Sequence, residues 1–255
     1  MPLTYLSHQA AVLPLKMWRP ASFDGTALVF GSMAPDWAYV FNGSHIQINA
    51  HRWPAATWFA VTTAVVASLV VRRFEPQLVA GLPVAPRWLR DVARGRPARH
   101  SLLLVVASAA IGVVTHVVWD MFTHNFRWGA QHIHWLREPM TIGSRTMTHA
   151  QVLQEISTVG GAIITVALLA WVGHRRAALT WRPESRPVLI PRADWRVLAM
   201  TAAAVAVGAW WASGAHHDLA AGVNRLVLTA GAGYVAAAAI FLSRDVTEER
   251  HADEP

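Results

Sequence analysis

Long apolar runs separated by polar loops dominate the hydrophobic pattern of this 255-residue chain. A transmembrane helix needs about 20 mainly apolar residues. Five runs approach that length: residues 55–71, 101–122, 156–172, 195–212 and 223–242. Residues 22–41 are a weaker sixth candidate, because Asp24, Pro35 and Asp36 suit a short helix ending in a turn, or a re-entrant piece, better than a span. The pattern predicts an all-α fold, a polytopic membrane helical bundle of about five to six transmembrane helices.

The composition supports a membrane protein with the lipid bilayer as its partner. Hydrophobic residues make up 54% of the chain and charged residues only 15%, which is too apolar for an ordinary soluble domain. The net charge of +7 would suit a nucleic-acid binder. The arginines, however, lie in loops between apolar runs, so we expect no nucleic-acid partner. Because the chain has no cysteine, any metal site must use His, Asp and Glu.

The arginines also predict an orientation. The loop after the first run carries Arg72, Arg73, Arg87, Arg90, Arg94, Arg96 and Arg99, and the loop after the third carries Arg175, Arg176, Arg182, Arg186, Arg192 and Arg196. Residues 123–155 contain only three arginines, and residues 214–224 contain no Arg or Lys. Cytoplasmic loops are enriched in Arg and Lys. We therefore predict a multi-pass protein of the cell membrane, with the N-terminal fifty residues and the 123–155 loop on the extracytoplasmic face.

These features divide the chain into four parts. Residues 1–174 form a membrane-embedded helical domain that holds the candidate site, and residues 175–194 form an Arg-rich cytoplasmic loop. Residues 195–243 form a C-terminal transmembrane hairpin, and residues 244–255 form a polar tail. The first residues lack the basic region of a cleavable signal peptide, so we expect them to remain in the mature protein. Nothing in the pattern specifies an oligomeric state.

The candidate chemistry centres on His116, Asp120 and His124, at the end of the second apolar run. Three side chains of metal-ligating type recur there at every fourth residue. On a helix this spacing places them along one face, with a drift of about 40° per step. A carboxylate in an apolar span is costly unless it is paired, which makes Asp120 a functional candidate.

Other polar segments are predicted on the same side of the membrane. His8 follows Ser7, a candidate cap for a helix over residues 10–15. Asp36 ends the segment that begins at Gly31, and His51 lies just before the first run. His149 and Glu155 precede the third run. Imidazoles and carboxylates form the ligand set of Zn²⁺, Mn²⁺ or Fe²⁺. The candidate metal ligands are thus His8, Asp36, His51, His116, Asp120, His124 and His149.

Structural roles remain open for many of these residues. Histidines near span ends commonly lie at the membrane interface, as we expect for His45, His132, His134, His216 and His217. Asp36 could instead cap the next turn. Asp120 could pair with an arginine or a backbone donor without any metal. Most tryptophans lie at span ends, where they act as interface anchors.

Three segments resemble a known family. Gly31-Ser-Met-Ala-Pro-Asp36, His116-Val-Val-Trp-Asp-Met-Phe-Thr-His124 and Gln151-Val-Leu-Gln-Glu-Ile-Ser-Thr-Val-Gly160 are similar to bacterial membrane proteins of domain of unknown function family 4184. The similarity runs from Leu6 to about Gly173, and the last two apolar runs look like an appendage. That family has no established activity to carry over.

A more distant resemblance concerns metal-dependent hydrolases. The order His, Pro-Asp, His, His-x-x-x-Asp is similar to inner-membrane hydrolases of the YdjM type and to the zinc-dependent phospholipase C and P1 nuclease group. This resemblance implies His8, Asp36, His51, His116 and Asp120 as zinc ligands, with Asp120 as a bridge and with His124 and His149 serving a further ion. The late His-x-x-x-Glu or His-x-x-x-Asp pair of those enzymes has no counterpart at His149, so one or two ions are expected rather than three.

Three functions follow as hypotheses. The leading one is an outward-facing metal site, suited to zinc, in a hydrolase of phosphoester or lipid-linked substrates. The second is a divalent metal transporter, but the third, fourth and fifth runs contain no Asp, Glu or His. The third is a non-catalytic membrane scaffold that binds a partner through its outer loop.

Overall fold

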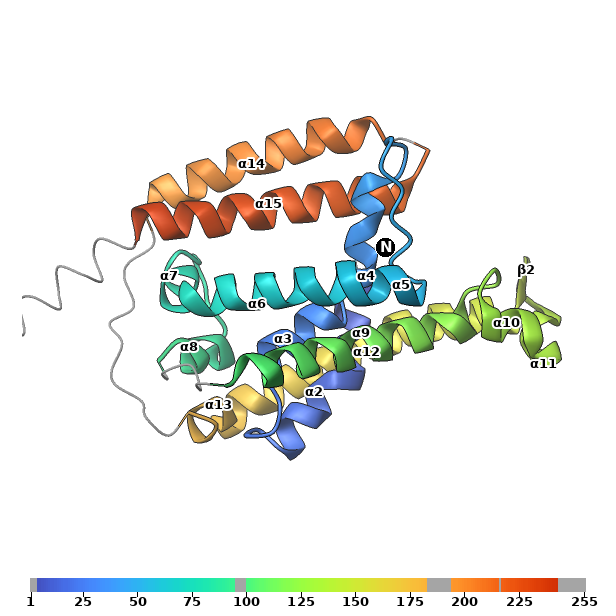
Figure 1. Ribbon diagram of the computed structural model, residues 1–255, viewed down its shortest axis with the longest axis horizontal. Coiled ribbons are helices and arrows are strands. Elements are labelled where there is room, and N and C mark those ends of the chain that lie inside the picture. Colours follow the sequence, from blue (N-terminus) through green and yellow to red (C-terminus); the bar gives the residue numbers. More distant parts are fainter. Residues whose placement is uncertain (1–3, 95–99, 183–193, 216, 243–255) are drawn as a thin grey trace, which may run out of the picture. The chain divides into compact units, whose positions relative to one another are not determined.

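A computed structural model describes residues 4–94, 100–182, 194–215 and 217–242 (Figure 1). Among them, five helical segments are long and apolar enough to cross a membrane: Trp53–Arg73, Leu102–His132, His149–Arg175, Trp195–Ser213 and Leu219–Phe241. They match the five predicted runs, and the predicted all-α membrane fold is confirmed. The predicted polar tail, residues 244–255, and most of the Arg-rich loop lie outside the described residues.

The sixth candidate span, residues 22–41, forms short helices instead. They are α3 (Gly25–Gly31), α4 (Ala34–Trp37) and the 3₁₀ helix η1 (Ala38–Phe41), each much shorter than a span. The Asp24 carboxylate caps α3 by accepting a hydrogen bond from the Ala27 amide at 2.9 Å. Pro35 occupies the first turn of α4, where its missing amide hydrogen costs nothing. The Asp and Pro residues therefore act as helix-end signals.

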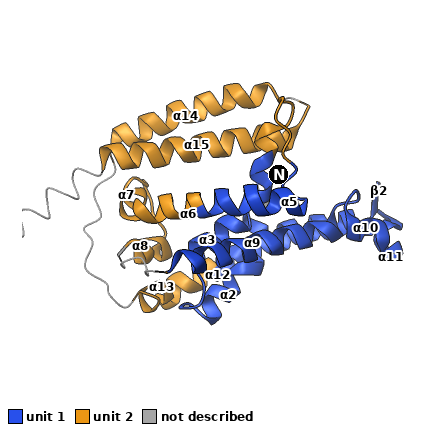
Figure 2. Ribbon diagram, in the orientation of Figure 1, with its two compact units in different colours: residues 1–38, 49–65, 101–168 blue, residues 39–48, 66–100, 169–255 orange. Residues whose placement is uncertain are grey.

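The chain divides into two compact units (Figure 2). The first contains residues 1–38, 49–65 and 101–168, and the second contains residues 39–48, 66–100 and 169–255. Elements of the first unit are α1 (Thr4–Ser7), α2 (Gln9–Trp18), α3, α4, α5 (Trp53–Ala55), the π-helix η2 (Ala56–Val61), α9 (Leu102–Thr123), α10 (Trp128–His132), α11 (His134–Arg137), β1 (Pro139–Ile142) and β2 (Arg145–Thr148). Helices α6 (Thr62–Arg73) and α12 (His149–Arg175) each contribute residues to both units.

Within the first unit, α3 packs very closely on α9. Gly31 faces the backbone of Ala109, and Gly112 faces the backbone of Leu28 and Ser32. A Cβ at Gly112 would lie 2.7 Å from the Ser32 nitrogen, which is closer than real Cβ contacts. Small residues let helix backbones approach at such crossings. The two glycines therefore set the distance at which α3 presents Ser32 and the following Asp36 segment to α9.

The N-terminal residues pack against α12. The Leu6 carbonyl accepts a hydrogen bond from the Thr165 hydroxyl at 2.8 Å, and Gly161 leaves room for the backbone of Ser7. The prediction that Ser7 caps the following helix is wrong. Ser7 is the last residue of α1, and His8 occupies the N-cap position of α2 without a side-chain capping bond. The close packing on α12 holds Ser7 in a helical turn and orients the next residue, His8.

The segment between α9 and α12, which was predicted to be the outer loop, contains the only strands among the described residues. Strands β1 and β2 pair antiparallel, with Met140 opposite Met147, and Gly143 in the turn has a positive φ of 61°. Helices α10 and α11 precede this hairpin. His132 in α10 stacks on Trp128, and His134 in α11 contacts Glu138 at 3.2 Å. Both histidines have local partners here.

The second unit contains η1, α7 (Glu75–Ala80), α8 (Arg87–Arg94), α13 (Ala177–Thr180) and the hairpin of α14 (Trp195–Ser213) and α15 (Leu219–Phe241). Its buried carboxylates are paired: Glu75 contacts Arg182 at 2.7 Å, and Asp91 contacts Arg176 at 2.9 Å. Arg225 on α15 is buried and donates to the carbonyl of Asn42 at 2.7 Å and of Val40 at 3.2 Å. These pairings give a structural role to each of the three buried charges, Glu75, Asp91 and Arg225.

Candidate metal centre

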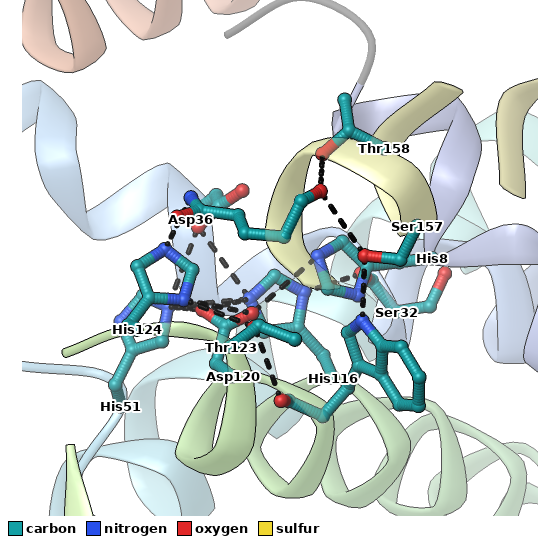
Figure 3. A network of polar contacts seen from close by, with 12 residues as sticks. His8, Ser32, Asp36, His51, His116, Asp120, Thr123, His124, Ser157 and Thr158 are labelled. Atoms are coloured by element: carbon teal, nitrogen blue, oxygen red, sulfur yellow. Dashed lines mark hydrogen bonds and ion pairs between the residues drawn. The ribbon is translucent and has the colours of Figure 1, made fainter. Parts of the chain in front are cut away.

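Four residues from three separate segments meet in the first unit (Figure 3). His116 and Asp120 lie one turn apart on α9, Asp36 lies in α4, and His51 lies just before α5. One ligand atom from each residue lies within 4.8 Å of the others. This is the group that could hold a metal ion among the described residues.

The distances within this group fit a tetrahedral ion. Ligand atoms about 2.0–2.1 Å from zinc lie about 3.3–3.4 Å from one another. His51 Nε2 lies 3.3 Å from Asp36 Oδ1, 3.2 Å from Asp120 Oδ2 and 3.2 Å from His116 Nε2. His116 Nε2 lies 3.5 Å from each of the two carboxylate oxygens. Five of the six pairs thus have the spacing of one coordination shell, and the sixth pair, Asp36 with Asp120, lies within 4.8 Å.

The protonation of the two imidazoles also favours a cation between them. His116 Nδ1 lies 2.8 Å from the Ser32 carbonyl, which can only accept, so this nitrogen carries a hydrogen. A neutral ring with its hydrogen on Nδ1 directs the lone pair of Nε2 toward the group. A carbonyl that fixes the tautomer of a histidine in this way is the usual outer partner of a metal ligand. Because the two Nε2 atoms are only 3.2 Å apart, they cannot both carry a hydrogen without repulsion.

Charge and burial point to a divalent cation. His116 and His51 are buried, Asp120 is almost fully buried, and the Asp36 side chain is 13% exposed. Burial raises the pKa of Asp36, but interactions with His116 and His51 outweigh it and hold that pKa below its ordinary range. With both imidazoles in the neutral form that ligates metals, the two carboxylates would give the group a formal charge of −2, which a divalent ion would balance. The donor set is therefore suited to Zn²⁺ in residue type, spacing and charge.

His8 lies beside this group. Its ring stacks on His116 with a centroid distance of 3.9 Å, and its Nε2 lies 3.7 Å from Asp120 Oδ1. Burial, followed by the interaction with His116, lowers the pKa of His8 to about 3, so the ring is neutral at physiological pH. His8 faces the oxygen of Asp120 that points away from His51. It packs against the ligand group rather than belonging to the set of four.

His124 approaches Oδ1 of Asp120, the oxygen that His8 also faces. We call it the outer oxygen of Asp120. His124 Nδ1 lies 3.6 Å from Asp120 Oδ1, and His124 Nε2 lies 3.0 Å from the amide nitrogen of Gln154 on α12. The His124 side chain is 21% exposed, more than any of the four grouped residues. The two oxygens of Asp120 therefore face different imidazoles: Oδ2 faces the four-residue group, and Oδ1 faces His8 and His124.

The remaining predicted residues lie elsewhere. His149 begins α12, and its ring stacks on Trp135 with a centroid distance of 4.5 Å. Glu155 is exposed and contacts Arg145 at 3.7 Å. Neither belongs to the group of close ligand atoms. The His-to-Asp spacing on α9 places His116 and Asp120 on one face, whereas residues at the start of α12 follow the separate geometry of the segment between α9 and α12.

Sequence reasoning missed two contributors to the site. Ser32 acts through its backbone carbonyl, which a sequence pattern of side chains cannot reveal. Gln154 lies in a polar stretch of α12 with Ser157 and Thr158, whose hydroxyls both donate to the Gln154 carbonyl. Trp119 on α9 donates to Ser157 at 3.2 Å and links the two helices. A signal for Gln154 was available in the sequence, because Gln154, Ser157 and Thr158 recur at three- and four-residue spacing and so form a polar face on α12.

The site lies toward one end of its span. At about 1.5 Å per residue, His116 is about 21 Å and Asp120 about 27 Å along α9 from Leu102. The Arg-rich loop precedes Leu102, so the group lies toward the opposite end of the helix. His51 likewise lies just before the first span, whose far end carries Arg72 and Arg73.

Comparison with known proteins identifies a family without an assigned activity. No curated protein matches the chain, and no solved structure matches it. Residues 1–242 match the family described as a domain of unknown function (DUF4184). The match extends beyond the expected limit near Gly173 and includes α14 and α15, so the last two spans are part of the family rather than an appendage. The chain is a multi-span helical membrane protein with a buried His/Asp group. It belongs to the DUF4184 family, which is described as a domain of unknown function.

Proposed function

We propose that the protein is a membrane metalloprotein that binds a divalent cation, Zn²⁺ by preference, through Asp36, His51, His116 and Asp120. The observation that carries this proposal is the mutual spacing of the four ligand atoms, all within 4.8 Å. Three features support it: the tautomer of His116 set by Ser32, the close Nε2 atoms of the two histidines, and the charge of −2. Nitrogen and carboxylate donors in a tetrahedral arrangement favour zinc over magnesium or calcium.

We further propose that this centre hydrolyses a phosphoester or lipid-linked substrate. A bound zinc supplies a Lewis acid and lowers the pKa of a coordinated water. A catalytic site needs one exchangeable position beside three firm protein ligands. His51, His116 and Asp120 are the more buried ligands, whereas Asp36 is the most exposed of the four. In this scheme His51, His116 and Asp120 would hold the ion, and Asp36 would be the carboxylate that accepts a proton from water.

The described spans favour this function over metal transport. A carrier needs a second set of polar ligands deep in another span. Helices α14 and α15 contain no Asp, Glu or His, and in α12 such residues occur only near the two ends. The guanidinium of the buried Arg225 on α15 donates hydrogen bonds to backbone carbonyls. One polar group at the end of a span is the arrangement of a local site rather than of a pathway.

Elemental analysis combined with a hydrolysis assay tests the proposal. Protein purified in detergent without chelator should contain about one zinc per chain. It should cleave bis(p-nitrophenyl) phosphate or phosphatidylglycerol in vesicles, and removal of the metal should abolish cleavage. The His134→Ala variant is a suitable control, because that side chain is 83% exposed and lies in the outer segment. Absence of metal would refute the metal centre, whereas metal without cleavage of either probe would refute only the hydrolase.

The proposed orientation has its own test. Because the chain has no cysteine, single cysteines can be introduced at His132 and at Arg87 without a background signal. We expect an impermeant thiol reagent to label intact cells at position 132 but not at position 87, because the Arg-rich loops should remain in the cytoplasm. Labelling of position 87 in intact cells would show that the orientation is the opposite of the proposed one, with the site on the cytoplasmic side.

A further inference from the structure

We propose that His124 is not a metal ligand but a positioning residue, which Gln154 orients so that its Nδ1–H faces Oδ1 of Asp120, the outer oxygen of that carboxylate. The inference rests on the proposed metal centre and assigns the residues around it. It departs from the spacing argument, in which every histidine of the His116–Asp120–His124 face is a ligand. Three independent features of the geometry support it.

The first feature is the complete shell. Four donors already lie within 4.8 Å of one another and complete the usual zinc ligand number, so His124 would be a fifth ligand. Its Nδ1 is 3.6 Å from Oδ1 of Asp120, the oxygen that does not face His51 and His116. A fifth ligand to the same ion would need to approach the group on the Oδ2 side. The position of His124 is therefore that of an outer partner.

The second feature is the contact with Gln154. The amide nitrogen of Gln154 lies 3.0 Å from His124 Nε2, and an amide nitrogen can only donate. His124 Nε2 must then accept, so the hydrogen of the neutral ring is on Nδ1. The Thr123 hydroxyl accepts this hydrogen at 3.3 Å, and Asp120 Oδ1 lies 3.6 Å from Nδ1, at the distance of an electrostatic contact. A nitrogen that carries a hydrogen cannot ligate a metal.

The third feature is the anchoring of Gln154 itself. Ser157 and Thr158 both donate to its backbone carbonyl, at 3.1 Å and 2.7 Å, and Trp119 donates to Ser157. These bonds tie the turn of α12 that carries Gln154 to α9. Gln154, His124 and Asp120 thus form a chain of contacts between two helices that ends on the proposed ion.

The consequence is a carboxylate held in one orientation. If Oδ1 is held by His124, Asp120 presents Oδ2 alone to the ion. Loss of an outer partner of this kind typically weakens metal binding by about 10–100-fold without removing a ligand. A lost ligand, in contrast, changes the number of donors around the metal. Affinity and coordination can therefore be measured separately to test the assignment.

The experiment replaces the metal by Co²⁺, whose visible absorption spectrum reports the coordination geometry. Full-length protein in detergent is titrated with Co²⁺ as wild type and as His124→Ala, His124→Asn and Gln154→Ala. The side-chain amide nitrogen of Asn occupies the place of Nδ1 and donates, but it is a poor metal ligand. His132→Ala, which removes another histidine of the same outer segment, is the matched control.

We expect one Co²⁺ per wild-type chain, and His124→Ala to bind it about 10–100-fold more weakly with an unchanged spectrum. Gln154→Ala should shift in the same direction, and His124→Asn should recover most of the lost affinity. The inference is overturned if His124→Asn binds as weakly as His124→Ala with an altered spectrum, or if both variants lose a second ion present in wild type. It is also overturned if His124→Ala binds normally. A wild type that binds no Co²⁺ refutes the metal centre itself.

Discussion

Asp120→Asn should reduce the metal content from about one ion per chain to nearly none while the protein still inserts and folds. The change preserves the shape of the side chain but removes one of the two charges that balance the cation. Asp120 contacts histidines rather than an arginine, so no buried positive charge is stranded. His116→Ala should behave in the same way, since it removes the nitrogen whose tautomer Ser32 fixes.

Metal content and thermal stability, measured together, check this expectation. A ligand at 100 times its dissociation constant stabilises the folded state by about 2.7 kcal/mol. A chelator should therefore lower the Tm of wild type but leave that of Asp120→Asn unchanged. His134→Ala should retain both the metal and the chelator response. Full metal content in Asp120→Asn would remove this carboxylate from the centre, and a wild-type Tm insensitive to chelator would argue against a bound ion.

Gly112→Ala should destabilise the protein and weaken the metal site together. The new Cβ would lie 2.7 Å from the Ser32 nitrogen and 2.9 Å from the Gly31 carbonyl carbon, so α3 must move away from α9. Overpacking of this kind typically costs about 1–3 kcal/mol. The same displacement separates the Ser32 carbonyl from His116 Nδ1 and Asp36 from the other ligands. We therefore expect a lower Tm and a lower metal affinity from a substitution that touches no ligand.

Gly160→Ala provides the matched control. Gly160 is also a helical glycine of the first unit, but a Cβ there meets nothing within 4 Å. Alanine favours a helix over glycine by about 1 kcal/mol, so this variant should be as stable as wild type or more stable. Equal Tm and equal metal affinity for the two variants would contradict the close crossing of α3 and α9.

The spans were predictable because the membrane imposes one strong local rule. Every backbone polar group in hydrocarbon must be satisfied within the span, so a sufficiently long apolar run becomes a helix. The predicted run 195–212 corresponds to α14, Trp195–Ser213, almost residue for residue. The predicted run 156–172 is the central part of α12, which begins at His149 because polar residues can extend a helix beyond the membrane.

The site was only partly predictable, because only part of its geometry is local to a single helix. The spacing of His116 and Asp120 determines their common face on α9, because helical geometry is local. Whether Asp36 and His51 reach that face depends on the approach of α3 to α9 at Gly31 and Gly112, which no spacing encodes.

By itself, the sequence determined the all-α membrane fold, its five spans and the face of α9 that carries His116 and Asp120. The tertiary structure alone decided which histidines gather beside Asp36 and Asp120 and which do not. It brought Asp36 and His51 to within 3.5 Å of His116 Nε2, and it placed His124 against Gln154. It also left His149 stacked on Trp135. Periodicity is a property of one helix, whereas coordination depends on distances between segments, and only packing sets those distances.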